Sequence, residues 1–116
     1  MLPSYFPAPD EKIWIGVLRV QLSFPGSKNL KNKRKELSKV KSRLSNKHNI
    51  SIAEVGHLEN IKRSILGICI ISNDNLKLES VLQRCFQDIA SIIDGRIDDS
   101  FHQILPFSSS RDLNAF

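Results

Sequence analysis

The positively charged residues of the chain crowd into one stretch, Lys28 to His48, and the chemistry that such residues offer is the binding of anions. This stretch holds nine of the 17 Lys and Arg residues and a single acid, Glu36. It therefore carries a formal charge of +8, whereas the rest of the chain, with eight cations and eleven acids, sums to −3. A positive surface this concentrated favours a polyanionic partner.

The apolar residues of the stretch predict that it forms an α-helix. They recur at spacings of seven, three and four, which places Leu30, Leu37, Val40 and Leu44 on one stripe of a helix. The opposite side then carries a ladder of cations facing solvent, formed by Lys31, Lys35, Lys39 and Arg43. Lys33 lies close to the stripe, and we expect it either to extend along the core or to pair with an acid such as Glu54.

Two features of this helix favour bound phosphate. Cations one turn apart weaken an isolated helix, and cations near its amino terminus oppose the helix dipole. A bound phosphate relieves both penalties. We therefore predict phosphate contacts to RNA or the ribosome, without base readout, from Lys28, Lys31, Arg34, Lys35, Lys39 and Arg43. The alternative is a dimeric protein-interaction or small-ligand module whose basic face only keeps it soluble.

Residue types used in catalysis form no comparable pattern. No metalloprotease, serine-hydrolase or phosphate-loop motif occurs, and we interpret His57 and His102 as surface or edge residues. Cys69 and Cys85 match neither a disulfide framework nor a zinc motif, so we expect buried free thiols. The sequence predicts a protein that is not an enzyme and needs no cofactor or metal.

The elements around the basic helix predict an α+β fold. Apolar patterns predict strands at 13–24, 50–55, 61–72 and 96–105, and a second helix between caps at 72–74 and a left-handed Gly95. The order β-α-β-β-α-β is that of a ferredoxin-like sandwich, a four-stranded antiparallel sheet with both helices on one face. We expect one domain over 13–105, a flexible arm at 1–12 and a flexible tail at 106–116, after Pro106 ends the last strand.

The other face of this sheet stays open unless something covers it. RNA-recognition domains of the same strand order stack bases on aromatic residues of the two central strands, and the strand at 61–72 has none. We expect that strand to be buried on both faces, and the last strand to place Ile97, Phe101 and Leu105 together. Apolar residues predict a covered open face, with a second copy as the most economical cover: Ile15, Val17, Ile65 and Ile71.

No membrane span or signal peptide is expected. The longest apolar run, 65–71, contains a glycine and is far shorter than the roughly 20 residues that a spanning helix needs. The first twelve residues lack a basic region before an apolar stretch. We therefore expect a cytoplasmic protein.

Six short pieces of the chain, in order and at matching separations, resemble the YlxP-like proteins, a bacterial family of small uncharacterised domains. They are Gly16-Val17-Leu18-Arg19, Pro25-Gly26, Leu30-Lys31-Asn32-Lys33-Arg34, Ala53-Glu54-Val55-Gly56, Leu66-Gly67 and Ser72-Asn73-Asp74. The chain departs from the family at 57–61, where the family usually has a Gln-Asp pair and a tryptophan. The resemblance implies a ferredoxin-like fold and no established activity. The genes of the family commonly lie beside those for translation initiation and ribosome maturation, which favours ribosomal RNA as the polyanion.

Overall fold

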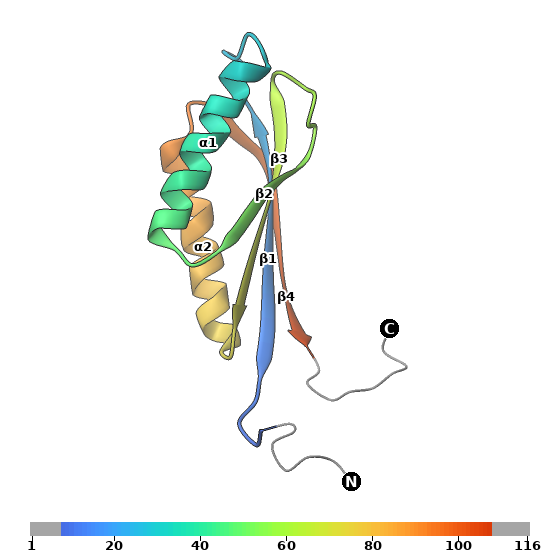
Figure 1. Ribbon diagram of the computed structural model, residues 1–116, viewed down its shortest axis with the longest axis vertical. Helices are drawn as coiled ribbons and strands as arrows, with labels where there is room; N and C mark the ends of the chain where they lie inside the picture. Colours follow the sequence, from blue (N-terminus) through green and yellow to red (C-terminus); the bar gives the residue numbers. More distant parts are fainter. Residues whose placement is uncertain (1–7, 108–116) are drawn as a thin grey trace.

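Four strands and two helices follow one another in the order β-α-β-β-α-β (Figure 1). The computed structural model describes residues 8–107. Its elements are β1 (Ile13–Ser23), α1 (Leu30–Lys47), β2 (Ser51–Gly56), β3 (Arg63–Ser72), α2 (Asn75–Ile92) and β4 (Arg96–Phe107). The strands pair antiparallel in the spatial order β2-β3-β1-β4, which places the first and third strands in the middle. The predicted ferredoxin-like α+β fold is confirmed.

Every strand begins and ends within two residues of its predicted bounds. The edge strand β4 ends two residues later than predicted, at Phe107 and not at 105. The strand continues through Pro106, opposite Trp14, to Phe107. Proline fits there because β4 is an edge strand, where a missing backbone donor need not break the sheet. Most of the predicted arm and tail, residues 1–7 and 108–116, lies outside the described residues.

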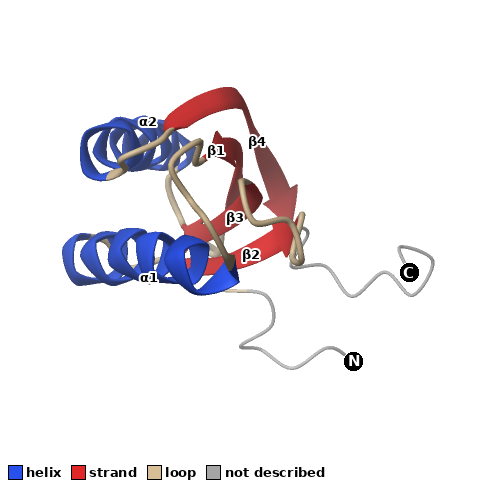
Figure 2. Cartoon of the chain, turned by 90° about the horizontal axis from the view of Figure 1, so that it is seen from above, coloured by secondary structure: helices blue, strands red, loops and turns tan. Residues whose placement is uncertain are grey.

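The core fills the space between the sheet and the two helices, which cover the same face (Figure 2). Side chains alternate along a strand, so β1 contributes Leu18, Val20 and Leu22 to the core and turns the residues between them away. The helices contribute their predicted apolar stripes, of which the buried members are Leu37, Val40 and Leu44 in α1 and Leu78, Leu82, Cys85 and Ile89 in α2.

The central strand β3 is buried on one face only, which corrects the prediction of burial on both faces. Leu66, Ile68 and Ile70 face the helices, whereas Cys69 and Ile71 point to the open side and are exposed. The expectation that both thiols are buried is therefore wrong for Cys69 and right for Cys85. Burial raises the pKa of the Cys85 thiol to about 11, with a smaller contribution from the nearby charge of Asp88.

A β-bulge near the start of β4 separates residues that were predicted to share a face. The pairing of β4 with β1 shifts between Gln21, opposite Asp99, and Leu22, opposite Ile97. Asp98 is the extra residue, and its carboxylate accepts hydrogen bonds from Ser23 Oγ and from Arg96 Nε. Ile97 consequently turns to the core, while Phe101 and Leu105 remain on the open face.

Gly95 is required for a different reason from the predicted left-handed helix end. No glycine in residues 8–107 has a positive φ. A Cβ at position 95 would overlap the backbone carbonyl oxygen of Ser23. Glycine is therefore needed because the chain passes close to the end of β1 there.

Candidate nucleic-acid interface

The basic helix α1 begins with neutral caps and no acid in its first turn. The side chain of Asn29 accepts a hydrogen bond from the backbone N–H of Asn32 at 2.8 Å. In return, the Asn32 side-chain oxygen accepts from the backbone N–H of Lys28 at 3.2 Å. Glutamate is the residue that commonly fills the position of Asn32, and a carboxylate there would offset the positive end of the helix dipole. The start of α1 is thus left positively charged.

Lys33 is the one cation of α1 that is fully buried. Its ammonium lies 3.0 Å from Glu54 Oε2, which confirms the predicted pairing with that acid. The same nitrogen also donates to the backbone carbonyl oxygens of His57, Arg63 and Leu58 at 2.8, 3.1 and 3.3 Å. Lys33 therefore ties the loop between β2 and β3 to α1 and has no charge left for a ligand.

Two further cations of α1 are paired with acids on or beside the helical layer. Lys39 Nζ lies 3.3 Å from Glu36 Oε2 and 3.7 Å from Asp94 Oδ2, and its side chain is only 32% exposed. Lys47 Nζ lies 3.0 Å from Asp88 Oδ1. Lys39 was predicted to stand in the solvent-facing ladder with Lys35, but it turns toward Glu36 and the end of α2.

The remaining predicted contact residues form a set that we call the basic patch: Lys28, Lys31, Arg34, Lys35 and Arg43. All five are exposed, and none makes a salt bridge within residues 8–107. Because no acid of the described residues pairs with it, the basic patch keeps its charge. Of the six predicted site residues, five thus make no salt bridge to any residue of 8–107, and one, Lys39, is paired with acids.

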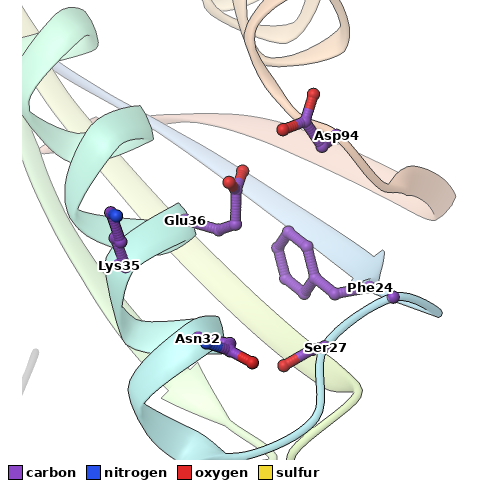
Figure 3. A pocket seen from close by; sticks show the side chains of 7 residues that line it. Phe24, Ser27, Asn32, Lys35, Glu36 and Asp94 are labelled. Carbon is purple, nitrogen blue, oxygen red and sulfur yellow. The ribbon is translucent and has the colours of Figure 1, made fainter.

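A pocket of about 310 Å³ adjoins the basic patch between the start of α1, the end of β1 and the loop after α2. The Glu36 side chain points from α1 into the space between the Phe24 ring and the Asp94 side chain (Figure 3). With two carboxylates and a single cation, Lys35, in its lining, the pocket does not suit a phosphate group. An anion would instead meet α1 on its outer surface.

The histidines are placed in three unlike settings. His57 is exposed at the end of β2, where its φ of 55° is left-handed, and His102 Nε2 lies 2.8 Å from Glu79 Oε1. Sequence reasoning missed His48, whose Nε2 lies 2.8 Å from Asp88 Oδ2. Hydrogen bonds lower the pKa of the Asp88 carboxyl group below its ordinary value, the one from His48 contributing most and the one from Lys47 next. This contact joins positions 40 residues apart, so no local pattern signals it.

Neither metal-binding clusters nor membrane-spanning helices occur in the part of the chain that is described. Over residues 8–107, no group of three or more His, Cys, Asp or Glu side chains is arranged to hold a metal ion. Within the same residues, neither helix is long and apolar enough to cross a bilayer.

Comparisons with known proteins identify the family. Among solved structures, the chain is similar to two de novo designed proteins, each at 12% sequence identity. Foldit4 gives a TM-score of 0.45 over 84% of this chain and 98% of its own, and Ferredog-Diesel gives 0.44 over 77% and 83%. The "Uncharacterized protein YlxP" of Bacillus subtilis (strain 168) is 37% identical over 62 residues, which are 53% of this chain and 67% of that protein. The model of the family described as "Protein of unknown function (DUF503)" matches residues 15–100. The chain therefore belongs to the DUF503 family of proteins of unknown function, the YlxP-like family that its sequence resembles.

Proposed function

We propose that the protein binds structured RNA, with ribosomal RNA as the first candidate, through phosphate contacts made by the basic patch. In this proposal it acts in translation or ribosome maturation as a binding protein and not as an enzyme. One observation carries the proposal: five exposed cations gather on α1 and its approach without an acid partner among residues 8–107. Unpaired cations on one surface favour the release of counterions from a nucleic-acid backbone, the main source of sequence-independent affinity.

The placement of the aromatic side chains supports contact with phosphates instead of bases. Exposed rings occur on β4, at Phe101 and Phe107, on the open face of the sheet. The basic patch lies on α1, in the layer that covers the opposite face (Figure 2). Proteins that read or stack single-stranded bases combine rings and cations on one surface. Here the exposed rings lie away from the basic patch, and the cation opposite Phe101, Arg19, is paired with Asp99. Backbone contacts are therefore the interaction that α1 can make.

A filter-binding titration against purified ribosomal RNA at rising salt tests the proposal. Lys31→Ala/Lys35→Ala removes two charges from the basic patch. Lys77→Ala/Arg84→Ala removes two charges from exposed positions of α2 and is the matched control. We expect the first variant to bind more weakly. Its slope of log affinity against log salt should be smaller by about 0.9 for each duplex phosphate that is no longer neutralised, or by about 0.7 for single strands.

Three outcomes would contradict the proposal. No binding at low salt would remove the RNA partner altogether. Binding that does not respond to salt would exclude phosphate contacts as its source. Equal reductions in affinity in the two double variants would mean that net charge, and not the basic patch, determines the affinity.

A further inference from the structure

The open face of the sheet exposes an unusual number of large apolar side chains. Strand pairing places them on one surface, because residues opposite each other in neighbouring strands point to the same side. Ile15 lies between Ile71 of β3 and Leu105 of β4, and Ile13 lies opposite Phe107. The exposed members of this surface are Val17, Val55, Ile71, Phe101, Leu105 and Phe107. A single-chain protein rarely leaves such a surface in water.

The polar groups on the same face carry both signs of charge. Arg19 and Asp99 lie side by side near its middle, 3.6 Å apart, and both are partly exposed. Asp98 and Arg96 form a second pair at the start of β4, at 2.8 Å. A surface that presents both signs can pair with an identical surface, whereas the basic patch would repel its own copy.

The size of the face is close to what a stable pair of proteins needs. Neighbouring strands lie about 4.8 Å apart, and a strand rises about 3.3 Å per residue. With the lengths of β1, β2, β3 and β4, these spacings give the face of the sheet a projected area of about 600 Å². A typical specific interface buries about 800 Å² on each partner, measured over the uneven molecular surface. The face alone can therefore supply most of an interface.

We propose that a second copy of the chain covers the open face and forms a two-fold dimer in which the two sheets stack. The helices then lie on the outside of four layers, α-β-β-α, with the sheets in the middle. The two basic patches remain exposed on opposite outer surfaces, so this dimer and RNA binding do not depend on one another. Failure of either proposal leaves the other standing.

Sedimentation of residues 1–116 over a range of concentrations tests the dimer. Phe101→Glu places a charge in the proposed interface at a side chain that is 61% exposed in the single chain, so the core is untouched. Leu76→Glu is the matched control, because Leu76 is 78% exposed on α2, in the helical layer. We expect wild type and Leu76→Glu to have twice the mass of one chain, and Phe101→Glu to have the mass of one chain.

Thiol labelling gives an independent measurement in the same samples. Cys69 is exposed on the open face, opposite Val17, and should be covered in the dimer. Cys85 is buried in the core and reports unfolding, which separates a dissociated variant from a misfolded one. We expect the labelling rate of Cys69 to fall as wild-type concentration rises, and to be independent of concentration in Phe101→Glu.

Two results would overturn the proposal. One is a wild-type protein that has the mass of a single chain at high concentration. This result would overturn the dimer whether the open face is then exposed to solvent or covered by residues 1–7 or 108–116. The other is a dimer that persists in folded Phe101→Glu with Cys69 as reactive as in the single chain. That result would place the contact between copies elsewhere, for example along the edge of β4.

Discussion

Lys33 and Lys35 are two residues apart on α1, yet they end in opposite surroundings. Lys33 is fully buried, with Glu54 and three backbone carbonyl oxygens around its ammonium. Lys35 is exposed and makes no salt bridge within residues 8–107. The difference follows from helix geometry, since two positions apart means about 200° around the axis. A run of lysines therefore contains residues with separate tasks, and only the unpaired ones are available to a partner.

The largest expected effect on stability comes from removing the buried ammonium of Lys33. Lys33→Met leaves the Glu54 carboxylate and the carbonyl groups of the loop after β2 without their donor. Removing one partner of a buried ion pair costs about 3–5 kcal/mol. We expect urea unfolding to show a decrease in stability of that size. Lys33→Met/Glu54→Gln should recover part of it, because the glutamine carries no charge and still accepts from Ser64 Oγ. A decrease in Lys33→Met no larger than that in Lys35→Ala would contradict the role assigned to Lys33.

The helical periods and the strand alternation made most of the fold predictable from the sequence. The stripe of α1 also placed Lys33 near the core, which made its pairing with Glu54 predictable. The bulge at Asp98 was not predictable, because one inserted residue leaves the composition of β4 unchanged while turning Ile97 to the other face. The pairing of Lys39 with Asp94 was also not predictable, since it depends on how α1 and the end of α2 lie side by side.

A smaller effect is expected at the carboxyl-terminal end of α1, where the cations are paired. Asp88 accepts hydrogen bonds from His48 and Lys47, which lower its pKa below the ordinary 3.8. A carboxyl group whose pKa is lower in the folded state stabilises the fold above its unfolded pKa. That contribution disappears as pH falls through the folded value.

The variant Asp88→Asn should therefore be less stable than wild type at neutral pH. The difference in unfolding free energy should shrink toward zero as pH falls below about 3.8. Urea unfolding at a series of pH values measures it. Glu59→Gln, at an exposed acid of the loop between β2 and β3, is the control and should show a flat difference. A difference that grows toward low pH would have the wrong sign for this contact.

The smallest expected effect on stability is that of Lys35→Ala, and it is compared with Lys39→Ala. The same two variants should differ clearly in RNA binding. Lys35→Ala removes an exposed cation that has no acid partner within residues 8–107, so the unfolding free energy should change by no more than about 0.5 kcal/mol. Lys39→Ala should cost more, because it leaves the buried Glu36 Oε2, which has no hydrogen bond within residues 8–107, without its nearest cation. Urea unfolding of the two variants measures this difference.

RNA binding should show the reverse order. The salt slope should fall by about 0.9 in Lys35→Ala if its ammonium neutralises one duplex phosphate. It should stay near the wild-type value in Lys39→Ala, because the charge of Lys39 is already shared between Glu36 and Asp94. If the slope falls equally in the two variants, these two acids do not neutralise Lys39, and the basic patch extends along the whole predicted ladder.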